Sequence, residues 1–152
     1  MHEALRLARH GAAQGEVPAG AVVVVAGEIA GRGWNAPLAR TDPTAHAEIL
    51  ALREAALHVG NYRLEHATLY CTLEPCAMCA GACVWARIGA VVYGVSQEDI
   101  AAYGGKRGTE EYKWRACLIP CRLVFEKGNH PIPVIGAFLR DECKKLFAYR
   151  AG

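Results

Sequence analysis

The 152-residue sequence predicts an α/β domain in which helices cover both faces of a mixed sheet of about five strands. Two observations predict this class. Apolar, β-branched runs alternate with segments of helical periodicity along the chain. The run GAVVVV at 20–25 also has the continuous apolar character of a strand that is buried on both faces. The length is that of one domain, so we expect residues 1–152 to fold as a single unit.

The first 60 residues predict a helix, a strand pair and a second helix. Apolar residues recur at helical spacing over 3–14. A turn at Gly27 separates strands at 20–25 and 28–35, which we expect to pair antiparallel. A loop with two prolines follows, and helical apolar spacing then predicts a helix over 44–59.

The next 35 residues predict a strand, a helix and a strand, over 67–72, 75–86 and 88–94. Pro75 suits the start of that helix because its missing N–H is not needed there. Strands joined through a helix normally run parallel, so we expect a mostly parallel sheet with the first strand pair as its antiparallel exception.

The pattern is weaker after Gly94. A short helix is predicted over 97–102, followed by a polar loop. Two short strands are predicted at 123–126 and 133–135, and a final helix over 138–149.

Charge and cysteine content limit the possible settings. A net charge of +2 argues neither for nor against nucleic acid. The longest apolar run lies within 19–26, which is too short to cross a bilayer, and the first residues lack the apolar run of a signal peptide, so we expect no membrane contact. Seven cysteines without secretory context indicate a reducing, cytoplasmic compartment.

Three residues have the spacing of a metal site. Cys76 and Cys79 place two sulfur atoms on one side of a helical turn, and His46 supplies a nitrogen from another helix start. This donor set suits a catalytic Zn²⁺, which keeps a fourth position open for water. Helix starts favour negative charge, which favours the thiolates that zinc requires.

Glu48 lies two residues after His46 and is not needed as a ligand. Zinc lowers the pKa of a bound water to about 7. A carboxylate beside it can carry the proton to a ring nitrogen and later to a departing amine. The pattern therefore predicts a hydrolytic reaction with one Zn²⁺ per chain, and its match to the signature of zinc nucleobase deaminases implies deamination of an amino-substituted heteroaromatic ring.

A closed structural zinc site is the alternative, with Cys83 as fourth ligand. Cys83 lies four residues after Cys79, about 6 Å further along the helix axis at 1.5 Å per residue. The metal should lie off the helix start, and a closed site leaves Glu48 unexplained. We therefore expect Cys83 to pack in the core, together with Cys71 and Cys143.

The remaining cysteines and histidines carry weaker signals. For the pair Cys117 and Cys121, a core or incidental role is favoured over a metal. Four isolated histidines are expected to be exposed: His2, His10, His58 and His66. Basic and aromatic residues mix in one segment: Lys106, Arg107, Lys113, Trp114 and Arg115. That segment is either a nucleic-acid surface or a solvated loop followed by a buried tryptophan, and the sequence leaves both open.

The pattern H-x-E…P-C-x-x-C is the signature of zinc nucleobase deaminases. Beyond it, the sequence resembles bacterial tRNA wobble adenosine deaminases. The segments that carry this resemblance are EVP at 16–18, GWN at 33–35, DPTAHAE at 42–48, NYRL at 61–64, TLEPCAMCAGA at 72–82 and RIG at 87–89, with NH at 129–130 and DEC at 141–143 near the end. The resemblance implies a cytidine-deaminase-like, three-layer α/β/α sandwich that forms a homodimer.

The resemblance also implies roles for individual residues. Zinc would be bound by His46, Cys76 and Cys79, and Glu48 would transfer protons. The residues implied to contact the target base are Asn35 through a hydrogen bond, Ala47 through its backbone amide and Val17 through packing on the ring.

The resemblance weakens after Gly94. Residues 95–100 read VSQEDI where the tRNA enzymes carry A-R-D-x-K-x-G, and the segment up to Asn129 is longer. In these respects the chain is similar to guanine or cytosine deaminases. Two substrates therefore remain open: adenosine at the wobble position of a tRNA anticodon loop, and a free base or nucleoside of guanine, cytosine or adenosine type. A zinc-stabilised RNA-binding scaffold without activity is a third hypothesis, which the intact signature disfavours.

Overall fold

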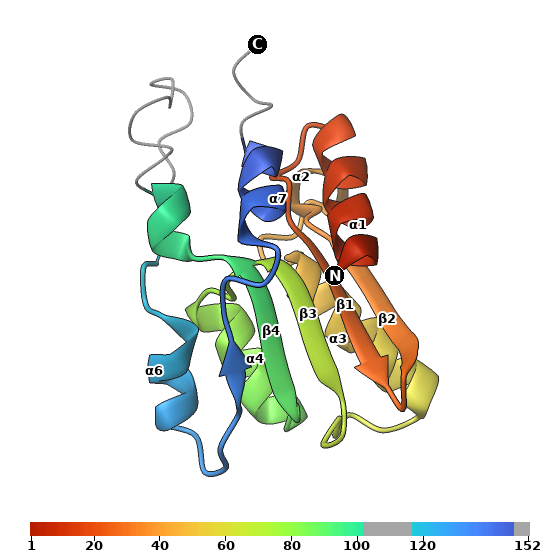
Figure 1. Cartoon of the computed structure of the whole chain (residues 1–152). Helices are drawn as coiled ribbons and strands as arrows, with labels where there is room; N and C mark the ends of the chain where they lie inside the picture. Colours follow the sequence, from red (N-terminus) through yellow and green to blue (C-terminus); the bar gives the residue numbers. More distant parts are fainter. Residues whose placement is uncertain (102–116, 148–152) are drawn as a thin grey trace.

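The computed structural model describes residues 1–101 and 117–147, which form a five-stranded sheet with helices on both faces (Figure 1). The strands are β1 (Gly20–Val25), β2 (Glu28–Trp34), β3 (Thr68–Leu73), β4 (Ala90–Val95) and β5 (Val134–Ile135). The labelled helices are α1 (His2–Ala13), α2 (Pro37–Arg40), α3 (Ala47–Val59), α4 (Ala77–Ala86), α6 (Cys121–Glu126) and α7 (Arg140–Lys145). Residues 97–101 are also helical, as predicted for the part of 97–102 that is described.

The sheet is mixed, and its order is β2-β1-β3-β4-β5. β1 runs antiparallel to both β2 and β3, whereas β3, β4 and β5 run parallel. The predicted antiparallel strand pair and the predicted parallel connection through a helix are both confirmed.

Two apolar clusters lie on opposite faces of this sheet, which makes the fold the predicted three-layer sandwich. The larger cluster packs α3, α4 and α6 against the sheet through residues such as Val23, Leu69 and Phe125. The smaller cluster joins Leu5 of α1 to Cys143 of α7 on the other face. Figure 1 shows α1 and α7 in front of the sheet, with α3 and α4 behind it.

Two glycines let β2 approach α3 closely. A Cβ atom on Gly33 would overlap the carbonyl oxygen of Ala47, and one on Gly31 would overlap that of Ala51. Real Cβ atoms do not come so near backbone atoms, so only glycine fits at these two positions. The first turn of α3 is therefore fixed beside the end of β2.

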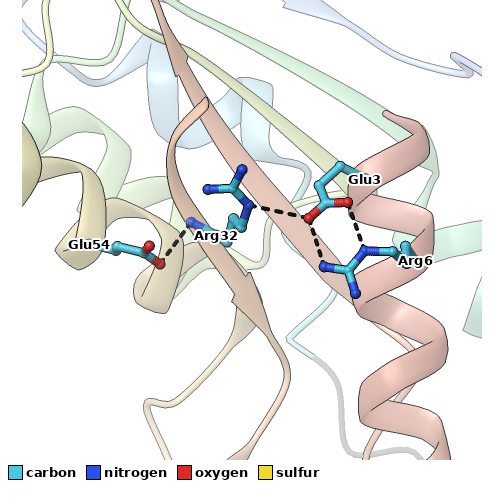
Figure 2. A network of polar contacts seen from close by, with 4 residues as sticks. All are labelled: Glu3, Arg6, Arg32 and Glu54. Carbon is cyan, nitrogen blue, oxygen red and sulfur yellow. Dashed lines mark hydrogen bonds and ion pairs between the residues drawn. The ribbon is translucent and has the colours of Figure 1, made fainter. Parts of the chain in front are cut away.

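A polar network ties the same edge strand to helices on both faces (Figure 2). The Glu3 carboxylate accepts from Arg6 Nε and Nη2, each at 2.8 Å, and from Arg32 Nε at 3.2 Å. The backbone N–H of Arg32 donates to Glu54 Oε2 of α3 at 3.0 Å. The network links α1, β2 and α3 at the surface.

The predicted strand at 123–126 is wrong, because these residues lie in helix α6. Cys121 and Phe125, four residues apart, are buried, while Leu123 is 48% exposed. In a strand Leu123 and Phe125 would share a face, whereas in a helix they point apart. The short apolar run CRLVF fits both patterns, and packing against α4 decides for the helix.

Other boundaries differ by a few residues. The helix predicted over 44–59 begins at Ala47, because Asp42 Oδ1 accepts from Thr44 N and Oγ1 at 2.8 and 2.7 Å and holds a turn there. The single turn α2 lies in the segment predicted as a loop. The final helix begins at Arg140 rather than 138, and positions 148–149 lie outside the described residues. Within 1–101 and 117–147, no helix has the length and apolar character that crossing a membrane requires.

Candidate active site

The first turns of α3 and α4 come together on one face of the sheet and carry the predicted ligands. His46 is the N-cap of α3, and Cys76 is the N-cap of α4. Cys79 follows in the first turn of α4 and is fully buried. His46 Nδ1 lies 3.6 Å from Cys76 Sγ and 3.5 Å from Cys79 Sγ.

These distances suit a tetrahedral metal site. The three ligand atoms all lie within 4.8 Å of one another. Zinc bonds of about 2.3 Å to sulfur and about 2.0–2.1 Å to nitrogen, at a tetrahedral angle, place nitrogen about 3.6 Å from each sulfur. Cys76 and Cys79 form no disulfide. The geometry and the chemistry of the donors therefore fit Zn²⁺.

The two cysteines and His46 shift one another's pKa values. A hydrogen bond from the Cys79 thiol, with a further one from His46, lowers the pKa of Cys76 to about 4. The same pairing with Cys76 raises the pKa of Cys79 and, with it, that of His46. One thiolate is thus already favoured, and metal binding must release the second thiol proton.

Glu48 lies in the first turn of α3 and is 6% exposed. Burial raises the pKa of its carboxyl to about 7, while the positive charge of His46 acts in the opposite direction. A buried carboxyl that titrates near neutrality beside a metal-type cluster can both accept and donate a proton.

The predicted base-contacting residues lie at the same edge of the sheet. Asn35 is buried and directly follows β2, and its backbone N–H donates to Ala19 O at 3.0 Å. The N–H of the next residue, Ala36, donates to Ala45 O at 2.9 Å, which brings Asn35 beside the start of α3. Ala47 is the first residue of α3, where backbone amides lack partners within the helix. Val17 packs against the larger apolar cluster two residues before Ala19.

Cys83 is fully buried and belongs to the larger apolar cluster. Among residues 1–101 and 117–147, the one group of converging metal-ligand atoms is His46, Cys76 and Cys79. Cys71 and Cys143 are also buried, as expected for core residues.

The remaining weaker candidates divide between core and surface. Cys121 is buried, whereas its partner in the C-x₃-C pair, Cys117, is exposed. The four isolated histidines are exposed, as expected: His2, His10, His58 and His66. The basic and aromatic segment from Lys106 to Arg115 lies outside the described residues.

Two buried polar residues close to the cysteines in the structure were not predicted from the sequence to have a role at the site. Glu74 is 6% exposed and Gln97 is 7% exposed. Glu74 immediately precedes Pro75, and this position next to the motif was the one signal available. Gln97 carried no signal, since it stands in the segment where the resemblance weakens.

The fold, the His-Cys-Cys cluster and the buried glutamate define the class of zinc-dependent deaminases. The family model of the cytidine and deoxycytidylate deaminase zinc-binding region matches residues 1–95. This chain therefore belongs to that family, and it is a hydrolytic deaminase.

Individual relatives cover nearly the whole chain. It is 43% identical over 147 residues to the tRNA-specific adenosine deaminase of Haemophilus influenzae, a match that spans 95% of this chain and 77% of that protein. A solved tRNA:A34 deaminase, from studies of A-to-I editing at the wobble position of transfer RNA, matches with TM-score 0.77 at 34% identity and covers 96% of each chain. The guanine deaminase of Bacillus subtilis matches with TM-score 0.65 at 34% identity, over 99% of this chain and 91% of that chain.

Proposed function

We propose that this chain is a Zn²⁺-dependent deaminase that converts adenosine to inosine at the wobble position of a tRNA anticodon. The observation that carries the chemistry is the convergence of His46 Nδ1 with two cysteine sulfurs beside a buried glutamate. The match to the Haemophilus influenzae tRNA-specific adenosine deaminase, which spans 95% of this chain, supports the substrate.

His46, Cys76 and Cys79 would hold the ion. Zinc bound there would supply water of lowered pKa, so that a nucleophile is available at neutral pH. The dipoles of α3 and α4 add positive potential at both ligand-bearing ends, which offsets part of the charge of the two thiolates.

Glu48 would move the protons of the reaction. The oxygen of water forms a bond to the carbon that bears the exocyclic amine, and Glu48 transfers the water proton to the neighbouring ring nitrogen. Glu48 then takes the second proton from the new hydroxyl group and gives it to the amine, the carbon–nitrogen bond breaks as the hydroxyl becomes a carbonyl, and ammonia leaves. One carboxylate can serve both transfers because the two nitrogens are close together on the same ring.

Three further residues would place the base. Asn35 has a side-chain amide that can both donate to and accept from a purine edge. The Ala47 backbone amide would donate from the start of α3, and Val17 would pack on the ring face. The target base must leave its stack to reach these groups, since the buried Glu48 lies below the surface.

A free base or nucleoside is the second candidate substrate. The segment after Gly94 departs from the pattern of the tRNA enzymes, and the solved guanine deaminase shares 34% identity with this chain. In this case the same zinc site and the same Glu48 chemistry would act on a small ligand.

We also propose a homodimer in a reducing, cytoplasmic setting. Large apolar side chains are exposed on neighbouring helices α3 and α4, with Leu57 at 85% and Trp85 at 82%. Such a surface favours association with a second chain. Light scattering of the chain and of Trp85→Lys tests the dimer, and a monomeric wild type would contradict it.

The cysteines bear on the compartment. All seven are free of disulfide bonds, which supports a reducing compartment.

The substrate is tested directly by incubating the zinc-loaded chain with an anticodon stem-loop that carries adenosine at the wobble position. We expect inosine in the RNA and no ammonia from guanine, cytosine, adenine or adenosine. Ammonia from a free base, with the RNA unchanged, would replace the tRNA substrate by the second candidate.

A further inference from the structure

A buried carboxylate joins three segments directly behind the cysteine pair. Glu74 is the first residue after β3 and is 6% exposed. Its Oε2 accepts from the backbone N–H of Gln97 at 3.2 Å, and its Oε1 accepts from that of Cys121 at 3.0 Å. Its own N–H donates to Val95 O at 2.8 Å. One side chain thus ties the end of β3 to the helix after β4 and to the start of α6.

The side chain of Gln97 completes the connection. Its Nε2 donates to Pro75 O at 2.9 Å and to Ile119 O at 3.3 Å. The Pro75 carbonyl belongs to the peptide bond that leads into Cys76. Because a peptide unit is planar, fixing this oxygen fixes the orientation of the Cys76 backbone nitrogen. The direction in which the Cys76 side chain leaves the chain depends on that plane.

We propose that Glu74 and Gln97 are positioning residues for the deaminase site: together they hold the Pro75–Cys76 peptide so that the Cys76 sulfur stays in place for the metal. The measurement of activity that tests this assignment rests on the proposed function, whereas the measurement of zinc release does not. Cys79 follows on the same helix, so a displaced helix start would move both sulfurs relative to His46. His46 itself belongs to α3, whose start is held by the separate turn at Asp42.

The chemistry of the contacts explains why a carboxylate is required. Glu74 accepts two backbone N–H groups with two oxygens, and hydrogen bonds to a charged acceptor are the stronger kind. A glutamine at this position offers one oxygen and one NH₂ group. One backbone N–H, of Gln97 or of Cys121, would then face a donor and remain unsatisfied in the interior.

The test uses the zinc-loaded full chain and two variants, Glu74→Gln and Gln97→Ala. Glu65→Gln is the matched control, because Glu65 is exposed and bonds only the exposed Arg87 among the contacts described. Zinc release to a chelator in excess is measured without substrate, and kcat and KM are measured on the anticodon stem-loop. We expect release about 10-fold faster in both variants, as for other residues that orient metal ligands. We expect kcat to fall and KM to stay unchanged, with the control behaving as the wild type.

Two results would overturn the assignment. Zinc release unchanged in both folded variants would mean that the contacts do not hold Cys76. A higher KM with unchanged release would mean that they act on substrate contacts instead. If Glu74→Gln fails to fold, Gln97→Ala decides, since it keeps the Glu74 carboxylate and both of its bonds to backbone N–H groups. A wild type that binds zinc but leaves the stem-loop unchanged would contradict the proposed substrate, while the release measurement would still test the positioning role.

Discussion

The first 95 residues supply most of the larger apolar cluster, whereas the described residues after Val95 supply only Cys121, Phe125 and Ile132 to it, together with three of the six buried residues of the smaller cluster. β2 lies against α3 at two glycines where no other residue fits. In the later part, Arg140 bonds Asp99 at 2.6 and 3.0 Å, and Arg122 bonds Val134 O at 2.9 Å. The labelled helices there, α6 and α7, have six residues each.

This difference indicates which positions of the fold tolerate substitution. The metal-type ligands and Glu48 all belong to the tightly packed part, where a small shift of a helix start would move a ligand atom. The later part adds fewer buried side chains, which lie on short elements, so more of its residues are exposed and free to differ. The match of the family model to residues 1–95 coincides with the packed part.

The sharpest test of the packed part is Glu48→Gln. The variant keeps the shape of the side chain but cannot accept and return a proton. We expect kcat on the anticodon stem-loop to fall by about 10²–10⁴-fold with zinc still bound. Glu54→Gln on the same helix, where the carboxylate is exposed, is the control and should stay active. A folded, zinc-loaded Glu48→Gln with normal turnover would refute the proton-transfer role.

The later part is best tested in α6, by Phe125→Ala and Leu123→Ala. Phe125 is 4% exposed in the larger apolar cluster, while Leu123 is 48% exposed. We expect the first change to lower the free energy of unfolding by about 3–5 kcal/mol and the second by less than about 0.5 kcal/mol. Denaturant titration measures both. Equal losses would indicate the strand arrangement, in which the two side chains share a face.

The close approach of β2 and α3 is tested by Gly33→Ala. The added Cβ would overlap the Ala47 carbonyl oxygen, so strand or helix must shift, and we expect a loss of about 2–4 kcal/mol in the free energy of unfolding. Gly81→Ala is the matched control, because Gly81 lies inside α4 with open space where its Cβ would be. Replacing glycine by alanine in a helix stabilises by about 0.5–1 kcal/mol. A stable Gly33→Ala would show that this contact is looser than the packing implies.

The same contrast governs what the sequence could predict. The strands at β1 to β4 and the convergence of His46 with the cysteines follow from periodicity and motif spacing, because long, strongly patterned segments leave few alternatives. Leu123 and Phe125 were misassigned because a five-residue apolar run fits a strand and a helix equally. Glu74 and Gln97 could not be paired from sequence, since their contacts join segments far apart in the chain. Long-range polar contacts have no local signature.

The smallest expected effects come from the surface ion pairs, one in each part. In the packed part, hydrogen bonds from Arg6, with help from Arg32, lower the pKa of Glu3 to about 2. In the later part, the bonds from Arg140 lower the pKa of Asp99. Both carboxylates are partly exposed, so Glu3→Gln and Asp99→Asn should each cost less than about 1 kcal/mol at pH 7.

The sign of the pH dependence follows from these lowered pKa values. A carboxylate whose pKa is lower in the folded chain than in the unfolded chain stabilises the fold. This contribution is fully present at pH values above the unfolded pKa, and it is lost as the pH falls through the folded pKa. The stability difference between wild type and Glu3→Gln should therefore be constant above about pH 5 and shrink towards pH 2, given an unfolded pKa of about 4.3. We expect Asp99→Asn to have the larger effect, because the bond between Arg140 and Asp99 joins positions 41 residues apart, whereas Glu3 and Arg6 lie three residues apart on one helix. A larger loss from Glu3→Gln would mean that its bond to Arg32 across α1 and β2, rather than the local pair, carries the stabilisation.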